Sequence, residues 1–437
     1  MIDFGKLHKE RKMTSELSGK DDGKSVSVAG WVYDIRDLGK IRFIVLRDMF
    51  GEIQVAAFKG KTEDSVYDAM GSVNRESVVI VRGKIVKSAK ASGGREIVPE
   101  EFELVAPAEE MLPLDVSDFS KTDLPKRLDY RFLDFHTKKS KAIFRIQSTI
   151  ASAFRDYFFR QGFIEMQPPC VISSSSEGGT DLFEVKYFDK KAYLAQSPQL
   201  YKQMLACSME RVFMITPVWR AEKHNTPRHL NEIRQMDVEC AFDGQFETMK
   251  RLEGVVKYIV ERVIKDNAED LKLLGVELKV PGAKYLSFAE VVEVLGKEGI
   301  EVSEDLTPEA ERKLCEIYSD DIVFVHSWPA ESKPFYIMPK DEKADAELSE
   351  GFDALYKGIE ISSGGQRIHL PDLLSDKIEA KGLDPKSFKD YIDSFRYGAP
   401  PHSGWSIGLE RMTAILCGLE NVKEGTMFPR DKDRLTP

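Results

Sequence analysis

Long apolar runs and paired cysteines are both missing from this 437-residue sequence. No stretch reaches the roughly 18 to 20 uninterrupted apolar residues that cross a bilayer, and the polar residues 1–24 lack the apolar core of a signal peptide. The five cysteines are Cys170, Cys207, Cys240, Cys315 and Cys417. They never form a Cys-x-x-Cys pair, which favours reduced thiols over disulfides or zinc. We therefore expect a cytoplasmic protein with no membrane partner.

An excess of positive charge is also absent, because the formal net charge is −10. By itself this value argues against a nucleic-acid partner. Residues 1–100 nevertheless contain 18 Lys+Arg and 15 Asp+Glu, a net of +3, so the remainder carries −13. The asymmetry permits RNA contact in the first hundred residues. A Gly-x-x-x-x-Gly-Lys-Ser/Thr string is missing too, so any bound nucleotide needs another kind of site.

The sequence does contain enough apolar residues, 42%, to build a large core, and its length predicts two domains or more. Five short strand-like runs fill the first hundred residues, with a helical stretch at 62–70 after the third run. This order is typical of an OB-fold, a partly open barrel that binds oligonucleotides, and a generic small barrel is the alternative. The five runs lie at 25–33, 42–47, 52–57, 77–86 and 96–105.

A second, larger region follows a proline-bearing acidic stretch at 109–123, which shows no sustained period and predicts a hinge. Apolar residues at spacings of three and four between Ile143 and Tyr157 predict a long amphipathic helix that ends near Gly162. Residues 243–330 carry no chemical motif. Further amphipathic helices are expected at 246–263, 286–295 and 308–318.

The stretch 199–242 concentrates polar chemistry. Alternation from Val212 to Glu222 predicts a strand that aims Arg220 from a rigid support. A basic loop follows, and 233–242 is predicted to be the returning strand of a hairpin. Upstream, Ser197-Pro198 has the form of an N-cap followed by a proline in the first helical turn. The helix predicted to start there places Gln199, Lys202 and Gln203 on one face. These groups are expected to converge near Arg220, whereas a surface ion pair would be the simpler reading of that arginine alone.

The string at 358–367, Gly-Ile-Glu-Ile-Ser-Ser-Gly-Gly-Gln-Arg, predicts a cation site. Glu360 in a strand and Ser363 at its end place a carboxylate and a hydroxyl where both can bind one hard cation such as Mg²⁺. The glycines then let the backbone turn and present Arg367. Outside this context, a Glu near a Ser is rarely a metal site.

The stretch 398–411 leads a strand into a helix whose apolar stripe begins at Leu409. Arg411 falls in the first helical turn, where the helix dipole disfavours a cation by roughly 0.3 to 1 kcal/mol. A local rule broken beside a glycine-rich turn indicates function. Neutralisation of Arg411 by its neighbour Glu410 is the alternative.

Together these strings resemble the class II aminoacyl-tRNA synthetases, with the closest match to the aspartyl enzymes of archaeal type. Residues 195–203, 220–222 and 228–232 resemble motif 2 and the helix before it, and 398–411 resembles motif 3. Further likenesses cover the anticodon-binding domain, motif 1 of the dimer interface, the mobile loop that closes over the amino acid, and the family ending. The anticodon-binding likeness lies at 30–32 and 43–54, motif 1 at 163–169, the mobile loop at 177–183, and the family ending at 428–431 and 434–437.

The resemblance implies an α+β fold with an OB-fold anticodon-binding domain at 1–107, a hinge at 108–135 and a class II catalytic domain at 136–437, whose antiparallel sheet is flanked by helices. It implies a homodimeric aspartate-tRNA ligase that uses ATP and Mg²⁺ to attach L-aspartate to tRNA(Asp) through an aspartyl-adenylate. Some members also charge tRNA(Asn). Attack of the α-carboxylate on the α-phosphorus requires stabilisation of negative charge by arginines and magnesium rather than a general base.

The resemblance also assigns roles to residues. Arg220 and Arg411 are the expected catalytic residues, and Glu360 and Ser363 the expected Mg²⁺ ligands. Phe43 is expected to stack on an anticodon base and Gln54 to read a base edge. The expected aspartate-binding residues are Glu177, Gln199, Lys202, Arg220, Ser363 and Arg367. The expected ATP-binding residues are Arg220, Glu222, Arg228, His229, Leu230, Glu360, Gly408, Leu409, Glu410 and Arg411.

Other functions stay open as alternatives. An asparaginyl-tRNA synthetase shares this architecture, but an asparagine amide would point N–H donors at Lys202 and Arg367 and forfeit charge pairing, which favours aspartate. A catalytically silent RNA-binding paralogue is disfavoured because Arg220, Glu360 and Arg411 are all present. The N-terminal barrel disfavours a tRNA-independent asparagine synthetase. The neighbourhoods expected to choose between tRNA(Asp) and tRNA(Asn), around Tyr33 and 91–94, match no assignable pattern.

Overall fold

In the computed structural model the chain folds as two units, Met1–Ser120 and Lys121–Pro437. The structure describes residues 4–91, 93–173 and 182–437. The predicted boundaries at 107 and 135 stay predictions.

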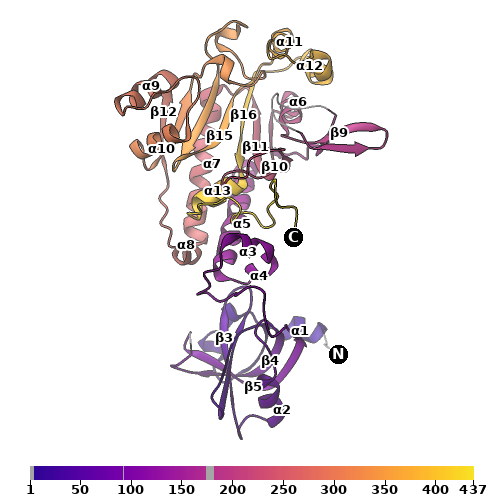
Figure 1. Cartoon of the computed structure of the whole chain (residues 1–437), viewed down its shortest axis with the longest axis vertical. Helices are drawn as coiled ribbons and strands as arrows, with labels where there is room; N and C mark the ends of the chain where they lie inside the picture. The colour runs from indigo at the N-terminus through magenta and orange to yellow at the C-terminus, as the bar shows by residue number, and fades with distance from the viewer. Residues whose placement is uncertain (1–3, 92, 174–181) are drawn as a thin grey trace. The chain divides into compact units, whose positions relative to one another are not determined.

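The first unit contains a closed five-stranded barrel with strand order β1-β2-β3-β5-β4. Its elements are α1 (Phe4–Glu10), β1 (Ser25–Asp37), β2 (Ile41–Arg47), β3 (Glu52–Phe58), α2 (Asp64–Gly71), β4 (Val78–Lys87) and β5 (Arg95–Ala106). Alternate residues such as Val26, Val28 and Val32 face the barrel core because successive strand side chains point to opposite sides. The predicted five strands, with one helix after the third, are confirmed (Figure 1).

The second unit is built on an eight-stranded sheet (Figure 1). Its strands, in spatial order, are β12 (Gly282–Ser287), β13 (Asp321–His326), β14 (Gly351–Tyr356), β15 (Ile359–Gln366), β16 (His402–Gly408), β11 (Glu232–Ala241), β10 (Arg211–Trp219) and β6 (Ile164–Glu165). Neighbours are antiparallel except the pairs β12–β13 and β10–β6. A small sheet joins β7 (Val171–Ile172), β9 (Lys190–Leu194) and β8 (Glu184–Tyr187). The predicted antiparallel sheet is thus confirmed, with a parallel pair at each edge.

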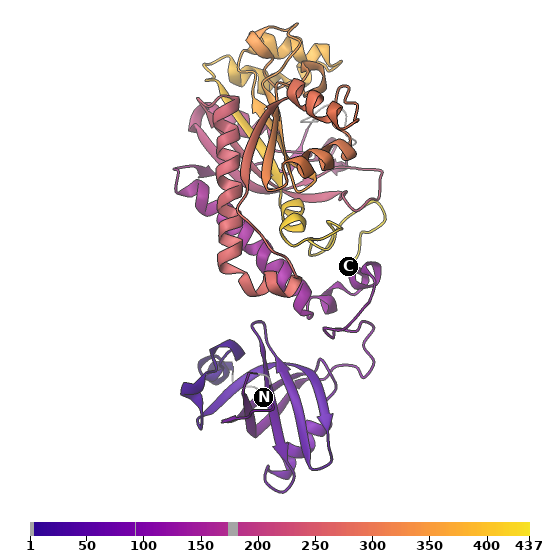
Figure 2. The same cartoon turned by 90° about the vertical axis from the view of Figure 1, so that its left-hand side faces the viewer.

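The second unit also contains helices, several of which pack against this sheet. They are α3 (Leu124–Asp129), α4 (Arg131–Asp134), α5 (Lys138–Phe159), α6 (Gln199–Met209), α7 (Gln245–Asp266), α8 (Ala268–Leu274), α9 (Phe288–Lys297), α10 (Pro308–Ile317), α11 (Pro371–Ala380), α12 (Lys389–Phe395) and α13 (Leu409–Leu416). The two longest, α5 and α7, lie side by side along one face of the sheet (Figure 2). Their apolar stripes form the main core, in which Phe154 contacts the rings of Phe158, Phe213 and Trp405.

Strand β11 separates this core from a polar face. Met236, Val238 and Cys240 belong to the core against α5 and α7. The intervening residues Gln235, Asp237 and Glu239 are buried but polar, and they lie on the opposite face because side chains alternate along a strand. One strand, β11, therefore contributes to the apolar core on one face of the sheet and to the polar surface on the other.

Two local expectations were wrong at helix starts. The helix expected at 286–295 begins at Phe288, because Leu286 and Ser287 end β12 and Ser287 forms a capping box with Glu290. Helix α6 begins at Gln199 with Pro198 at the N-cap, one residue later than the N-cap expected at Ser197. Among the described residues no helix combines the length and apolarity needed to span a bilayer.

We expect Phe154→Ala to lower the free energy of unfolding of the second unit by about 3 to 5 kcal/mol, because the fully buried ring leaves a cavity among packed aromatic side chains. Urea unfolding of the full chain measures the change. Ser148→Ala, at an exposed position of the same helix, is the matched control. Equal unfolding midpoints for the two variants would contradict this account of the core.

Candidate active site

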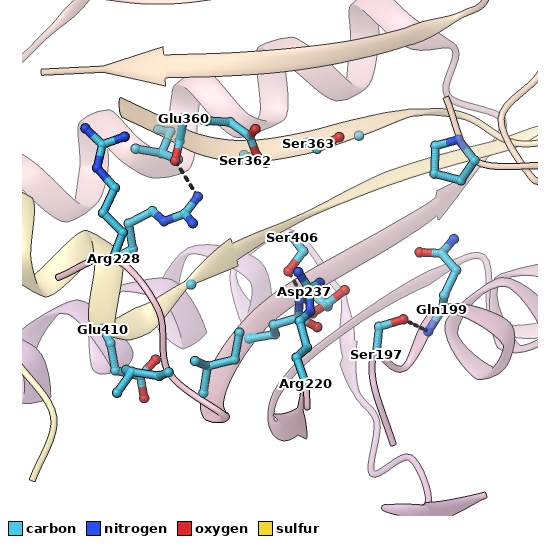
Figure 3. A pocket seen from close by; sticks show the side chains of 18 of the residues that line it. Ser197, Gln199, Arg220, Arg228, Asp237, Glu360, Ser362, Ser363, Ser406 and Glu410 are labelled. Atoms are coloured by element: carbon cyan, nitrogen blue, oxygen red, sulfur yellow. Dashed lines mark hydrogen bonds between the residues drawn. The ribbon is translucent and has the colours of Figure 1, made fainter. Parts of the chain in front are cut away.

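A pocket of about 280 Å³ opens on the polar face of the large sheet (Figure 3). It is lined by residues from α6, β11, β15, β16 and α13 and from the loop between β10 and β11. Leu409 instead packs in the apolar core, and Glu177 lies outside the described residues. The predicted residues that line the pocket are Gln199, Lys202, Arg220, Glu222, Arg228, His229, Leu230, Glu360, Ser363, Arg367, Gly408, Glu410 and Arg411.

The β10–β11 hairpin fixes Arg220 at the pocket. Arg220 directly follows β10, and its backbone N–H donates to the carbonyl of Asn231 at 3.0 Å. The buried side-chain amide of Asn231 donates in return to the carbonyls of Arg220, at 2.7 Å, and Glu222, at 3.1 Å. These bonds close the base of the loop, so the backbone that carries Arg220 is held on both sides.

Four buried charges form a cluster at the floor of the pocket, and three of them, Lys202, Asp237 and Arg367, line it directly. Lys202 Nζ lies 2.7 Å from Asp237 and 3.5 Å from Glu239, and Arg367 Nε donates to Glu239 at 2.9 Å. Burial alone would raise the pKa of the Glu239 carboxyl, but Arg367 and Lys202 hold it below its ordinary value. Two cations and two anions leave this cluster formally neutral. Lys202 and Arg367 are therefore already paired within the protein.

The strand β16 shapes this floor from the other side. Ser406 Oγ donates to Asp237 at 3.1 Å, and the carbonyl of Trp405 accepts from Lys202 at 3.3 Å. A Cβ on Gly404 would lie 2.1 Å from a Glu239 carboxylate oxygen and 2.2 Å from the carbonyl of Val238. Only a residue without a side chain allows the strand to pass this close to the carboxylate.

Sequence reasoning missed Asp237 and Glu239. The signal was present, because Gln235, Asp237 and Glu239 alternate with Met236, Val238 and Cys240 along a predicted strand. A strand with one apolar and one acidic face is expected to place its acids against buried cations. Pairing across strands, however, is not encoded in the local pattern of either strand.

A second acidic group lies at the other end of the pocket. Burial and the nearby Asp353 carboxylate raise the pKa of Glu360 to about 7. Asp353 was also not predicted from the sequence. It lies 2.5 Å from Lys333 Nζ and faces Ser363 across the β14–β15 ladder. Carboxylates that crowd each other beside a hydroxyl are a donor set suited to a hard divalent cation. The residues expected to bind Mg²⁺ therefore fit that ion chemically.

Glu410 does not neutralise Arg411 through a contact in this structure. The Glu410 carboxylate accepts the backbone N–H of Arg234 at 3.1 and 3.0 Å, whereas Arg411 Nη1 donates to the Glu360 carbonyl at 2.6 Å. Burial raises the pKa of Glu410 to about 7. The first turn of α13 is thus fastened to β11 by one residue and to β15 by the next.

The loop residues Arg228 and His229 lie over the same pocket. Arg228 Nη1 is 3.7 Å from Glu311 on α10, and His229 Nδ1 is 2.6 Å from Thr226 Oγ1. Glu311 lies in the region 243–330, for which the sequence offered no motif. Part of that region therefore borders the pocket through an ion pair, in addition to extending the sheet with β12 and β13.

In the barrel, Phe43 and Gln54 share one face. Val45 lies opposite Gln54 in the β2–β3 ladder, and Phe43 points to the same side because it is two residues from Val45. Both side chains are partly exposed. Gln54 Nε2 donates to Glu96 at 2.6 Å, which adds an acidic neighbour that the sequence had not indicated.

Two family models match the chain. The model for tRNA synthetases class II (D, K and N) matches residues 123–432, and the model for the OB-fold nucleic acid binding domain matches residues 26–110. The chain belongs to the class II tRNA synthetases. Its substrates are therefore an amino acid, ATP and tRNA, and the predicted combination of OB-fold and class II domain is confirmed.

The chain is also similar to individual members of this family. The chain is 42% identical over 429 residues to the aspartate–tRNA(Asp/Asn) ligase of Methanocaldococcus jannaschii, with 97% of each chain covered. It is 42% identical over 442 residues to the aspartate–tRNA(Asp) ligase of Pyrococcus horikoshii, with 99% of this chain and 100% of the relative covered. A crystal structure of asparaginyl-tRNA synthetase from Pyrococcus horikoshii complexed with asparaginyl-adenylate matches with a TM-score of 0.93 at 33% identity, covering 98% of this chain and 100% of that one. The fold is thus common to aspartyl and asparaginyl enzymes.

The raised pKa of Glu410 predicts a pH-dependent stability difference between the protein and its Glu410→Gln variant. Below the ordinary pKa of glutamate, the Glu410 carboxyl is protonated in both the folded and the unfolded state. Between about pH 4.5 and 7 the folded state keeps a proton that the unfolded state has lost, so stability falls as pH rises, by about 1.4 kcal/mol per unit and on the order of 3 kcal/mol in all.

The variant lacks this titration. Its free energy of unfolding should therefore increase relative to that of the wild type as the pH rises to about 7, and the difference should stay constant at higher pH. Urea unfolding at several pH values measures the difference, with Glu420→Gln, an exposed position in the segment after α13, as the control. A difference that is independent of pH would contradict the buried, proton-retaining carboxyl.

Proposed function

We propose that this chain is an aspartate-tRNA ligase that forms aspartyl-adenylate from L-aspartate and ATP and transfers the aspartyl group to tRNA(Asp). The observation that carries the proposal is the convergence of Arg220, Glu360 and Arg411 on a single pocket whose floor holds Lys202 and Arg367. The relatives named above, at 42% identity over nearly the whole chain, support the choice of aspartate.

The arginines supply what the first reaction step needs. Attack of the aspartate α-carboxylate on the α-phosphorus brings two anions together and builds negative charge on the phosphorus. We assign Arg220, beside Gln199 and the pocket floor, to the α-carboxylate and α-phosphate. Arg411, which projects from α13 toward β15, is assigned to the γ-phosphate side. Glu222, Arg228, His229 and Leu230 of the hairpin loop then hold adenine and phosphates.

Selection of aspartate rests on the four-charge floor. Nε and Nη2 of Arg367 already face Glu239, and Lys202 faces Asp237. We assign the remaining donors of these two cations to the substrate β-carboxylate, which accepts hydrogen bonds only. An asparagine would direct its own N–H donors at one of these donor groups, and a buried donor left without an acceptor costs binding energy. Glu177, Gln199 and Ser363 are assigned to the rest of the amino acid.

Magnesium completes the nucleotide site in this proposal. Glu360 and Ser363 would hold the ion on the phosphates, with Asp353 as a further carboxylate nearby. When bound, Mg²⁺ offsets the negative charge of the phosphates. The carboxylate pair that raises the pKa of Glu360 to about 7 supports this assignment, because a divalent cation relieves the repulsion between them.

The barrel is assigned to the anticodon. Phe43 offers an aromatic surface for stacking, and Gln54 offers paired donor and acceptor groups whose orientation is fixed by Glu96. Charging of tRNA(Asn) as well as tRNA(Asp) is part of the proposal, because the Methanocaldococcus jannaschii relative is named for both. Side-by-side charging of the two transcripts decides between one acceptor and two. A cytoplasmic location is proposed with this role in translation.

We expect the protein to catalyse ATP–pyrophosphate exchange with L-aspartate and at least about a thousandfold less efficiently with L-asparagine, because the amide N–H donors of asparagine would face the donor groups of Lys202 and Arg367. Arg220→Ala should lower kcat by roughly 10²- to 10³-fold, the effect of removing one preorganised donor to transition-state charge. Arg211→Ala, at the exposed start of the same strand, is the control. Exchange with asparagine alone would make the chain an asparaginyl enzyme.

We also propose a homodimer formed through the motif 1 region. Phe159, at the end of α5, and Ile164, on the edge strand β6, are exposed apolar side chains at adjoining positions of the fold. Unpaired edge strands with apolar side chains favour association. Sedimentation equilibrium should give twice the mass of one chain, and Ile164→Asp should shift it toward the monomer. A wild-type monomer at micromolar concentration would contradict this assembly.

A further inference from the structure

The loop between β10 and β11, residues 220–231, has no helix or strand of its own. It nevertheless carries Arg228, His229 and Leu230 over the pocket. An irregular loop keeps one conformation only when contacts from outside hold its polar groups. Other parts of the chain must therefore supply contacts to this loop.

The segment that follows α13, residues 417–437, supplies several of these contacts. The Val422 N–H donates to the carbonyl of Pro227 at 2.9 Å, and the Asn231 N–H donates to the carbonyl of Arg430 at 2.8 Å. Val422 itself lines the pocket. The C-terminal segment, yellow in Figure 1, therefore runs along the loop and takes part in the wall of the site.

Between these two backbone bonds lies a side-chain link centred on Asn225. Lys423 Nζ donates to Asn225 Oδ1 at 2.5 Å, and Asn225 Nδ2 donates to Asp433 Oδ2 at 2.5 Å. Both ends of the amide are thus engaged by the C-terminal segment. Asn225 lies three residues before Arg228, so its position bears directly on where that guanidinium points.

Lys423 is itself held in place. Its side chain is only 10% exposed, and its ammonium lies 2.6 Å from the Asp431 carboxylate. Asp431 Oδ1 also accepts the backbone N–H groups of Asp433, at 2.8 Å, and Arg434, at 2.9 Å. Burial alone would raise the pKa of Asp431, but Lys423 and these N–H groups lower it. A buried ion pair contributes little net stability, so its retention is better explained by the geometry that it imposes.

The far side of the segment is anchored on the helices that open the second unit. The fully buried Arg131 donates to the carbonyls of Glu424, Thr426 and Met427, and Arg434 Nη2 lies 2.7 Å from Asp129. The segment is therefore a fixed support between α3–α4 and the loop. A displacement of the loop would have to break its bonds to this support.

We propose that Lys423 is a positioning residue for ATP, which through Asn225 holds the 220–231 loop so that Arg228 and His229 face the nucleotide. This inference rests on the proposed function and extends it to a residue outside the three motifs. The amino-acid end of the pocket depends on Lys202, Asp237, Glu239 and Arg367, which make no contact with Asn225 or Lys423 among the described interactions. Loss of the link should therefore weaken ATP binding selectively.

The test is ATP–pyrophosphate exchange with Asn225→Ala, Lys423→Met and their double variant. Asn225 is exposed, so Asn225→Ala cuts the link without opening the buried ion pair. Each single variant should raise KM for ATP about tenfold, the loss expected of one charge-assisted hydrogen bond, and leave KM for aspartate within about twofold. The double variant should be no worse than the poorer single one, because both remove the same link. Lys423→Arg should restore part of the ATP affinity.

Lys432→Met is the matched control, because Lys432 is an exposed neighbour in the same segment. The inference is overturned if Asn225→Ala and Lys423→Met match this control in KM for ATP, or if both KM values rise together with a lower Tm, which would indicate general loosening. Failure of the proposed function is distinguishable, since the unmodified chain would then show no aspartate-dependent exchange.

Discussion

The second unit depends on the pairing of charged side chains that are buried beneath its pocket. Lys202, Asp237, Glu239 and Arg367 are all withdrawn from water, and each would be costly to bury alone. They are tolerable together because every cation lies against an anion within 3.5 Å. Three elements, α6, β11 and the segment after β15, supply these side chains, and β16 contacts them through Ser406 and the Trp405 carbonyl. The pocket floor is therefore formed only when the sheet is complete, which couples the existence of the site to the fold.

Strand β11 shows how one sequence stretch meets two demands. Its apolar residues pack against α5 and α7, and its polar residues build the pocket floor. A slip of one residue in register would exchange these faces, placing carboxylates in the core. The nine-pair ladder with β10, from Arg211–Cys240 to Trp219–Glu232, opposes such a slip along its whole length. The rigidity needed for the site is thus supplied by the pairing that forms the sheet.

Much of this organisation was predictable from local patterns. Periodicity located the barrel strands, the long helix and the β10–β11 hairpin, and the motif strings named nearly all the polar residues that line the pocket. What the patterns did not supply were partners: Asp237 and Glu239 for the cations, Asp353 for Glu360, and Arg234 rather than Arg411 for Glu410. These pairs lie on different strands or helices, and their separation along the chain hides them. Leu409 is the opposite case. It belongs to a motif with a predicted function, yet it packs in the apolar core, because this face of α13 anchors the helix to the rest of the unit.

The packing around Gly404, beside the pocket floor, leaves no room for a side chain at this position. The place where its side chain would lie is filled by the Glu239 carboxylate and the Val238 carbonyl, at 2.1 and 2.2 Å. At Gly408, four residues along the same strand, the nearest atom is a Cβ of Arg411 at 3.5 Å, an ordinary packing distance. Two glycines in one motif therefore have unequal freedom to vary. The first is closed to every larger amino acid by an occupied space, whereas the second has room for a methyl group.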